Sequence, residues 1–172
     1  ASFHGIQWDR QKNCWILPIR DPISGKLWGW QEKGSNRYFK NYPTGVQKSQ
    51  ALFGYGQYVD GPMIVVESPL DVVRLHSVGI TGGVSTYGSA VSITQLNLIR
   101  GAESVLFAMD NDESGRSSSD NLLQWSIKLG FEARFFNYHD IDVKDIGAMS
   151  KSEIIKGLAT AKHSILGEKA LW

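Results

Sequence analysis

The sequence has few of the features that mark several common protein classes. It contains one cysteine, Cys14, which excludes an internal disulfide framework and a cysteine-based zinc site and indicates a small apolar residue in a reducing compartment. No apolar run approaches the ~20 residues that a membrane-spanning helix needs, and no charged segment followed by an apolar one stands at the start. We therefore expect a cytoplasmic protein without a membrane partner.

Excess charge and the common nucleotide-binding motifs are lacking as well. Lys and Arg number 18 and Asp and Glu number 17, so the net charge is +1 and any basic surface must be local. Neither G-x-x-x-x-G-K-[ST] nor G-x-G-x-x-G occurs, no G-x-S-x-G elbow indicates a serine hydrolase, and the four histidines lack metal-ligand spacing. Nucleotide binding would have to rely on metal ions and scattered basic residues.

The first 61 residues differ in pattern from the rest of the chain. Residues 1–61 hold short apolar and aromatic runs separated by Pro and Gly, which predicts a small, mixed or antiparallel β-rich lobe without a convincing helix. Residues 22–25, Pro-Ile-Ser-Gly, suit a hairpin connection. The aromatic side chains of this lobe can form its core or stack against nucleic-acid bases.

From residue 62 to residue 172, apolar runs of strand length alternate with segments of helical spacing. The alternation predicts an α/β domain with a mainly parallel, Rossmann-like sheet flanked by helices. Pro69 suits a first helical turn, Ser92 and Asp112 suit N-caps, and Gly130 suits a helix end. The expected strands are 63–67, 82–87, 104–110 and 131–138, and the expected helices are 68–79, 92–101, 113–130 and 152–166, the last with Ser150 or Ser152 as its cap.

Acidic residues stand where two of the predicted strands end. Glu67 ends the first strand, Asp110 ends the third, and Asp112 follows two residues later. We expect them to lie together, because open α/β sheets bind their ligands at the carboxyl ends of the strands. Their oxygens are the hard ligands that Mg²⁺ or Mn²⁺ binds, and a bound dication removes their mutual repulsion. Taken alone, a glutamate such as Glu67 at a strand end is more often an exposed turn residue, and Asp112 can cap the next helix, a role that can coexist with metal binding.

Further residues can serve the same edge of the sheet. Asp71 lies in the first turn of the helix after Glu67, where its charge also favours the helix N-terminus. Asp142 and Asp145 follow the last predicted strand, in a segment that is equally consistent with a solvated loop. Gly88 and Arg116 lie in small, polar strand-to-helix turns whose backbone can approach phosphate.

Four motifs occur in an order that resembles one known family. They are residues 67–71 (ESPLD), 86–89 (TYGS), 110–116 (DNDESGR) and 142–145 (DVKD). This order resembles the Toprim domain of primases, type IA and II topoisomerases and some nucleases. Upstream, ILPIRDPISGKLWGW, RYFKNYPTG and KSQALFGYG resemble the front part of the catalytic domain of DnaG-type bacterial and phage primases. The resemblance runs from about Trp15 to about Leu158.

The resemblance implies roles for individual residues. Glu67 corresponds to a family glutamate that acts in acid/base chemistry or metal binding, and Asp110 and Asp112 correspond to the metal-binding pair, so these three are the expected catalytic residues. Two Mg²⁺ or Mn²⁺ ions are expected, and no structural zinc. The expected metal ligands are Glu67, Asp71, Asp110, Asp112, Asp142 and Asp145. The expected nucleotide or DNA contacts are Arg20, Arg37, Lys48, Gly88 and Arg116.

The sequence departs from the family pattern in three respects. Ser68 stands where the family usually has glycine, and residues 31–33, Gln-Glu-Lys, replace a stretch that commonly offers an arginine, with Lys33 as its substitute. The zinc-ribbon module and the helicase domain that accompany such primases are not encoded in these residues. This indicates either an excised fragment or modules encoded separately, as in a phage or plasmid system.

The resemblance implies a DNA-dependent RNA polymerase, the catalytic core of a DNA primase. Such a nucleotidyltransferase joins ribonucleoside triphosphates into short RNA primers on a single-stranded DNA template. Its expected setting is the cytoplasm of a bacterial cell or phage-infected host, beside a replicative helicase and a zinc-ribbon module in the same or another chain. Two alternatives stay open: a Toprim nuclease that cleaves DNA, and a non-catalytic module that binds single strands or a replication partner.

Overall fold

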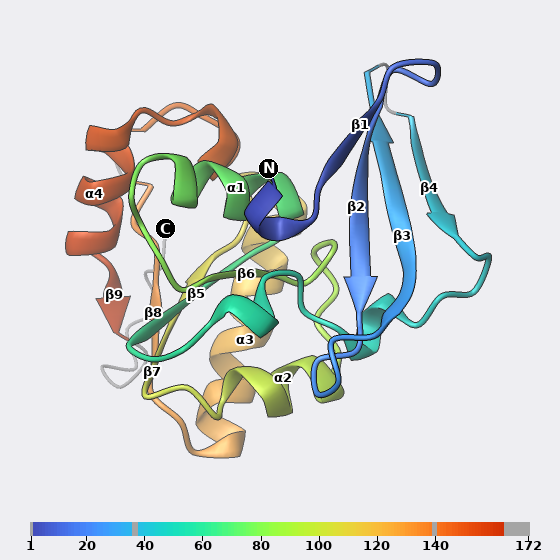
Figure 1. Ribbon diagram of the computed structural model, residues 1–172. Helices are drawn as coiled ribbons and strands as arrows, with labels where there is room; N and C mark the ends of the chain where they lie inside the picture. Colours follow the sequence, from blue (N-terminus) through green and yellow to red (C-terminus); the bar gives the residue numbers. More distant parts are fainter. Residues whose placement is uncertain (1, 36–37, 139–140, 164–172) are drawn as a thin grey trace.

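Two β-sheets form the framework of the chain. The computed structural model describes residues 2–35, 38–138 and 141–163, and it places a four-stranded antiparallel sheet beside a five-stranded sheet that helices flank (Figure 1). The first sheet has the order β1-β2-β3-β4. Its strands are β1 (Gln7–Asp9), β2 (Cys14–Arg20), β3 (Leu27–Gly34) and β4 (Phe39–Tyr42), and short 3-10 helices lie at Ser2–His4, Lys48–Gln50 and Tyr55–Gln57.

A hairpin joins β2 and β3, as the sequence predicts. The Asp21 carboxylate accepts hydrogen bonds from the backbone N–H groups of Ile23 and Ser24, and the Asp21 N–H donates to the carbonyl of Lys26. An aspartate that accepts from its own turn in this way favours a tight connection. The turn brings Leu17 opposite Gln31 in the antiparallel register.

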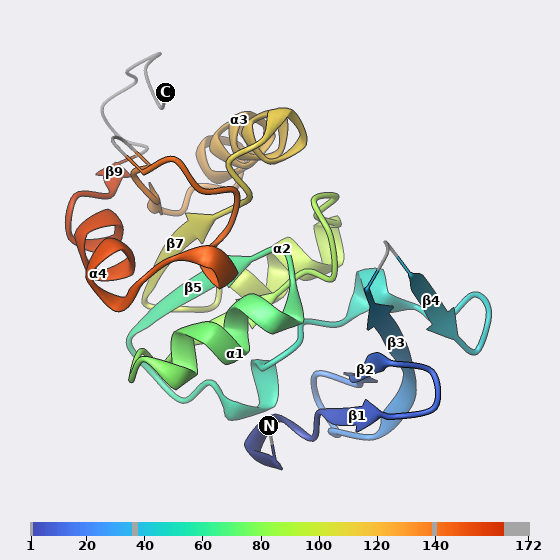
Figure 2. The same cartoon turned by 90° about the horizontal axis from the view of Figure 1, so that it is seen from above.

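The second sheet has the order β6-β5-β7-β8-β9, in which the first four strands are parallel and β9 is antiparallel to β8. One core layer contains side chains of α1 and α4, and the layer on the opposite face contains side chains of α2 and α3, so helices cover both faces (Figure 2). This confirms the predicted fold class. The bounds are β5 (Pro62–Val66), α1 (Pro69–Ser77), β6 (Gly83–Ser85), α2 (Ile93–Ile99), β7 (Ser104–Ala108), α3 (Glu113–Leu129), β8 (Ala133–Phe135), a 3-10 helix (Ile146–Ala148), α4 (Lys151–Ala159) and β9 (Lys162–His163).

Local sequence signals set the helix ends. The hydroxyls of Ser92 and Ser150 accept the backbone N–H three residues on and take part in capping boxes at α2 and α4. Asp112 caps α3, and Gly130 ends it in the left-handed conformation at φ 69°. The predicted caps are therefore confirmed, with Ser150 rather than Ser152 at the last helix.

The segment after α4 differs from the prediction. The expected helix over 152–166 stops at Ala159, and Lys162–His163 instead pairs with β8, where Phe135 lies opposite Lys162 and Arg134 opposite His163. Pairing satisfies backbone groups that β8 would otherwise leave open at the sheet edge. Residues 164–166 of the expected helix lie outside the described residues. None of the helices in the described ranges is long and apolar enough to cross a lipid bilayer.

The first sheet shares its core with the second. Leu17 and Ile19 of β2 belong to the same buried cluster as Ile64 and Val66 of β5. Trp15 and Trp28 pack against this cluster, so part of the aromatic content serves the core. The proposed boundary between residues 61 and 62 stays a prediction about domain organisation.

Candidate active site at the carboxyl edge of the parallel sheet

Glu67 and Asp110 meet because β5 and β7 are parallel neighbours. Val66 lies opposite Ala108 in the register, so the next residues of both strands leave the sheet at the same edge. The backbone N–H of Asp110 donates a hydrogen bond of 3.2 Å to Glu67 Oε1. The structure thus brings the first predicted carboxylate beside the second.

The shared edge changes the acidity of both groups. Burial raises the pKa of Glu67 to about 7, and the negative charges of Asp110 and Asp112 act in the same direction. Burial also raises the pKa of Asp110. Without a cation to balance them, such carboxylates retain protons to a higher pH than exposed ones. Glu67 is therefore not the exposed turn residue that its position in the sequence also allowed.

Asp112 combines two predicted roles. Its Oδ1 accepts the backbone N–H of Gly115 at 2.9 Å, which caps α3, and this bond is the main cause of a lowered pKa. A Cβ at Gly115 would lie 1.9 Å from the carbonyl oxygen of Asp110, so only glycine permits this close approach of the helix start to the strand end. Asp112 Oδ2 faces a different partner.

That partner is Lys144, a residue of the motif 142–145 that is not among the expected site residues. Its Nζ lies 3.4 Å from Asp110 Oδ2 and 3.4 Å from Asp112 Oδ2. The Asn111 N–H donates to the Lys144 carbonyl at 2.6 Å, and Asn111 Nδ2 donates to the Val143 carbonyl at 3.3 Å. The signal in the sequence was a basic residue inside an acidic loop that follows a strand.

Asp71, in the first turn of α1, lies close to Asp145, which precedes the 3-10 helix Ile146–Ala148. Asp71 is 4% exposed, and its pKa is raised to about 7 by burial first and then by the charges of Asp145 and Asp110. A Cβ at Gly147 would lie 2.9 Å from Asp71 Oδ1 and 3.1 Å from Asp145 Oδ1, so these two oxygens converge on a residue that has no side chain. Asp145 also caps the 3-10 helix, because its Oδ1 accepts the Ala148 N–H at 3.0 Å.

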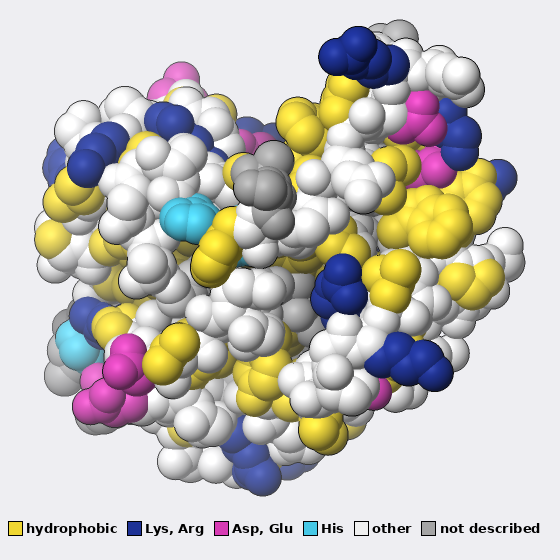
Figure 3. Space-filling model, viewed as in Figure 1, with side chains coloured by type: hydrophobic (Ala, Val, Ile, Leu, Met, Phe, Trp, Pro, Cys, Tyr) yellow, Lys and Arg dark blue, Asp and Glu magenta, His cyan; other side chains and the backbone are white. Residues whose placement is uncertain are grey.

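Two side chains from elsewhere reach this edge. Lys33 of β3 extends from the first sheet and donates from Nζ to Ser68 Oγ at 2.9 Å. Tyr138 donates from its hydroxyl to the Met109 carbonyl at 2.7 Å, and burial together with the nearby carboxylates raises its pKa. In the space-filling view a notch separates the first sheet from the rest, with acidic and basic side chains in its floor (Figure 3). Tyr138 has no motif signal in the sequence.

Gly88, Lys48 and Arg116 lie around the carboxylates. The Gly88 N–H donates to the Glu67 carbonyl at 2.9 Å with φ at +145°, and Lys48 Nζ donates to the Tyr87 carbonyl at 2.9 Å. Burial lowers the pKa of Lys48. Arg116 Nη1 donates to Asn111 Oδ1 at 3.3 Å. These three expected contact residues therefore surround one edge.

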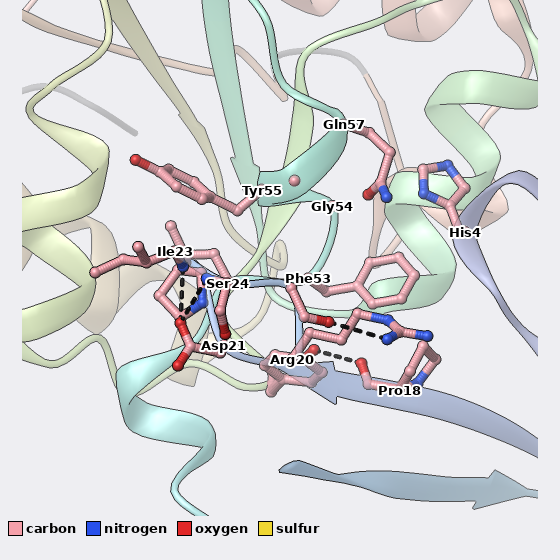
Figure 4. Close-up of a pocket in the computed structure, with 15 residues that line it drawn as sticks. His4, Pro18, Arg20, Asp21, Ile23, Ser24, Phe53, Gly54, Tyr55 and Gln57 are labelled. Atoms are coloured by element: carbon pink, nitrogen blue, oxygen red, sulfur yellow. Dashed lines mark hydrogen bonds between the residues drawn. The ribbon is translucent and has the colours of Figure 1, made fainter. Parts of the chain in front are cut away.

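Other expected site residues lie elsewhere. Arg20 lines a pocket of about 420 Å³ that none of the six expected metal ligands lines, and its Nη1 donates to the Gly25 carbonyl at 3.1 Å (Figure 4). Asp142 is exposed, and within the described part of the chain the hydrogen bonds and ion pairs of the site do not include it. Arg37 lies outside the described residues.

The donor atoms fit a hard cation in chemistry. Asp110 Oδ2 and Asp112 Oδ2 share one positive charge, the ammonium of Lys144. The raised pKa of Glu67 shows that its negative charge is poorly balanced in the metal-free site, and a bound cation would stabilise it. Across the described ranges, no three His, Cys, Asp or Glu side chains already have the arrangement of a metal site. Glu67, Asp110 and Asp112 are the residues that would hold Mg²⁺ or Mn²⁺.

A parallel sheet with carboxylates at its carboxyl edge and a β lobe packed beside it defines a class of protein. Residues 64–149 match the Toprim-like family model, which is half of the chain. The chain belongs to the Toprim-like family, in the form found in DnaG-type primases. Toprim and primase proteins are generally Mg²⁺-dependent.

Particular relatives are DNA primases. The chain is 30% identical over 159 residues to the DNA primase of Legionella pneumophila, a match that covers 82% of this chain and 27% of that protein. The fold is similar to a structure of the DnaG catalytic core (TM-score 0.74, 24% identity, 88% of this chain and 54% of that one). It is also similar to the DnaG primase catalytic domain bound to ssDNA (TM-score 0.73, 23% identity, 88% and 53%). The chain spans about a quarter of the length of the primases it matches.

Proposed function

We propose that the chain is the catalytic core of a DNA primase, which joins ribonucleoside triphosphates into short RNA primers on single-stranded DNA. The observation that carries the proposal is a set of three carboxylates at the carboxyl edge of the sheet, those of Glu67, Asp110 and Asp112. The ammonium of Lys144 lies between the two aspartates. Primase relatives supply the reaction class. When bound, Mg²⁺ or Mn²⁺, in a proposed two-ion site, would polarise the α-phosphate and neutralise the leaving pyrophosphate.

The residues of the chain divide the remaining work. Glu67, whose carboxylate lies beside Asp110, accepts the proton of the attacking 3′-hydroxyl. The new bond forms between that oxygen and the α-phosphorus, while the bond to the β-phosphate oxygen breaks and releases pyrophosphate. Lys33, Lys48 and Arg116 lie around the carboxylates and hold the phosphates of nucleotide and template.

The partners and the setting of the protein are part of the same proposal. Asp71 of α1 and Asp145 before the 3-10 helix support the metal-binding carboxylates, whereas Arg20 and Asp142 act away from them. Arg37 acts on the nucleotide or the template. A zinc-ribbon module and a replicative helicase act with this core in the same or another chain. The reaction takes place in the bacterial or phage-infected cytoplasm.

Incorporation of labelled ribonucleotides on a single-stranded template with Mg²⁺ or Mn²⁺ tests the proposal. We expect incorporation by the native chain, alone or with an added zinc-ribbon protein, and a loss of at least about 100-fold in Asp110→Ala. Asp60→Ala removes an exposed carboxylate of the loop before β5 and should have no effect. Equal activity of Asp110→Ala and the native chain would contradict the assignment. Metal-dependent DNA cleavage without nucleotides would replace it by a nuclease.

A further inference from the structure

Lys144 places a positive charge between the two aspartates of the proposed metal site. Its Nζ is 3.4 Å from an oxygen of each, Asp110 Oδ2 and Asp112 Oδ2. A lysine side chain is an ammonium at neutral pH. One ammonium therefore offsets the repulsion between two carboxylates at the same edge.

The backbone of Lys144 is fixed although its side chain is 62% exposed. Asn111, which stands between the two aspartates in the sequence, donates from its N–H to the Lys144 carbonyl at 2.6 Å and from Nδ2 to the Val143 carbonyl at 3.3 Å. These bonds tie the loop to the aspartates whether or not the ammonium touches them. The side chain can swing away without moving the loop.

A divalent cation and the ammonium compete for the same two oxygens, because like charges repel at contact distance. We propose that Lys144 is an internal substitute for the divalent cation: it holds Asp110 and Asp112 together while no metal is bound, and metal binding displaces it. The inference rests on the proposed function, since it takes both aspartates as metal ligands. It assigns a role to a residue that lies outside the expected ligand set.

Displacement leaves Lys144 beside the nucleotide. The loop keeps the ammonium at the rim of the carboxylate edge, where a triphosphate must approach bound metal ions. Lysine is a compact charge on a flexible stem and binds phosphate well. Lys144 thus leaves the carboxylates for the phosphate chain, and this exchange couples metal binding to nucleotide binding.

Two titrations on the full chain test the exchange. In Mn²⁺ binding followed by electron paramagnetic resonance without nucleotide, Lys144→Ala should bind Mn²⁺ about three- to tenfold more tightly than the native chain, because exposed ion pairs are individually weak but two are removed. In ATP binding followed by calorimetry at saturating Mn²⁺, the same variant should bind about threefold more weakly or worse. Lys144→Arg keeps the charge and should stay near the native chain in both. Lys156→Ala removes an exposed lysine of α4 and should change neither.

The opposite signs of the two effects distinguish exchange from loss of structure, which would weaken both. Unchanged or weaker Mn²⁺ binding by Lys144→Ala overturns the inference, and so does unchanged ATP binding. Asp110→Asn separates this failure from failure of the proposed function. If Asp110→Asn binds Mn²⁺ as tightly as the native chain, the proposed metal site is wrong. If it binds weakly while Lys144→Ala behaves as native, the metal site stands and only the role of Lys144 is wrong.

Discussion

The ammonium of Lys33 donates a hydrogen bond of 2.9 Å to the hydroxyl of Ser68 and so joins the first sheet to the start of α1. The same hydroxyl accepts the Leu70 N–H at 3.2 Å and caps the helix. Ser68 lies between Glu67 and Asp71, so this link fixes the position of the first sheet next to the carboxylates. The serine that departs from the family pattern has a structural use here.

Substitution of Ser68 tests this link. Ser68→Ala removes both the cap and the acceptor for Lys33 and should lower the free energy of unfolding by about 1–2 kcal/mol in urea denaturation. Ser68→Gly should recover most of the cap, since glycine costs only a few tenths of a kcal/mol at this position, while the bond to Lys33 stays lost. Ser150→Ala is the control for the cap alone, because the Ser150 hydroxyl accepts the Glu153 N–H at the start of α4 and its hydrogen bonds do not include a lysine ammonium. Native stability of Ser68→Ala would show that neither bond matters.

The acidity of Glu67 and Asp71 predicts an unusual pH dependence for the metal-free chain. Both have a pKa of about 7 in the folded state, against ordinary values of 4.5 and 3.8. The folded state therefore retains protons that the unfolded state releases, and this contribution to stability is lost as the pH rises from about 4 to about 7. His4, whose pKa burial lowers to about 4, acts in the opposite sense, because its contribution is lost as the pH falls below 6.5.

Comparison of variants isolates the carboxyl groups from His4. Asp71→Asn mimics the protonated acid, so in urea denaturation with chelator it should exceed the native chain by about 1–3 kcal/mol at pH 8 and match it near pH 4. Asp60→Asn makes the same chemical change at an exposed site and should follow the native curve at every pH. Parallel curves for Asp71→Asn and the native chain would contradict the raised pKa.

Gly115 should be among the least replaceable residues of the site. A Cβ there would lie 1.9 Å from the Asp110 carbonyl oxygen, so Gly115→Ala must push the start of α3 away from the strand end. We expect a loss of about 1–3 kcal/mol in the free energy of unfolding, together with weaker Mn²⁺ binding. Gly56→Ala is the matched control, because a Cβ at Gly56 meets no atom within 4 Å. A native-like Gly115→Ala would show that the helix start is not held as described.

Glu32 anchors the first sheet from within. It is 1% exposed, and its carboxylate accepts hydrogen bonds from Lys12 Nζ at 2.7 Å, Tyr38 Oη at 2.6 Å and Trp30 Nε1 at 3.4 Å. Burial alone would raise the pKa of Glu32, and these bonds outweigh it, so the pKa is lowered. The carboxylate is therefore charged at neutral pH, and both of its oxygens accept hydrogen bonds.

Removal of that charge should be costly. Glu32→Gln leaves Lys12 without its anion and turns an acceptor into a donor facing Tyr38, so we expect a loss of about 2–4 kcal/mol in the free energy of unfolding. The same exchange at the exposed Glu103 should stay within about 0.5 kcal/mol of the native chain. Equal effects at the two positions, measured by urea denaturation, would contradict the role of Glu32.

Local patterns in the sequence predicted what depends on neighbours along the chain. The alternation of strands and helices predicts helix caps such as Ser92 and Asp112. The contact between Glu67 and Asp110 follows from the rule that parallel strands end at one edge of the sheet. The position of Lys144 did not follow, because which side chain of a loop turns toward that edge depends on bonds made by Asn111 across the fold. The antiparallel strand β9, only two residues long, carries no pattern to detect.

Resemblance to a family predicted positions but not orientations. Arg20 occupies the expected place in its motif, yet the hairpin turns its guanidinium toward Gly25 and a separate pocket. Asp142 stands in the expected acidic loop but is exposed, whereas Asp145 in the same loop lies close to Asp71. Backbone course decides between such neighbours, and a single sequence does not record it.

The core that Leu17 and Ile19 share with Ile64 and Val66 has a consequence for cooperativity. Side chains buried in one continuous cluster lose their contacts together, so the first sheet would lose the apolar contacts of Leu17 and Ile19 if it separated from the second. The antiparallel sheet is therefore held against the second sheet by shared core contacts. Substitutions of its buried side chains should therefore lower the stability of the fold that holds the carboxylates, although these side chains do not contact them.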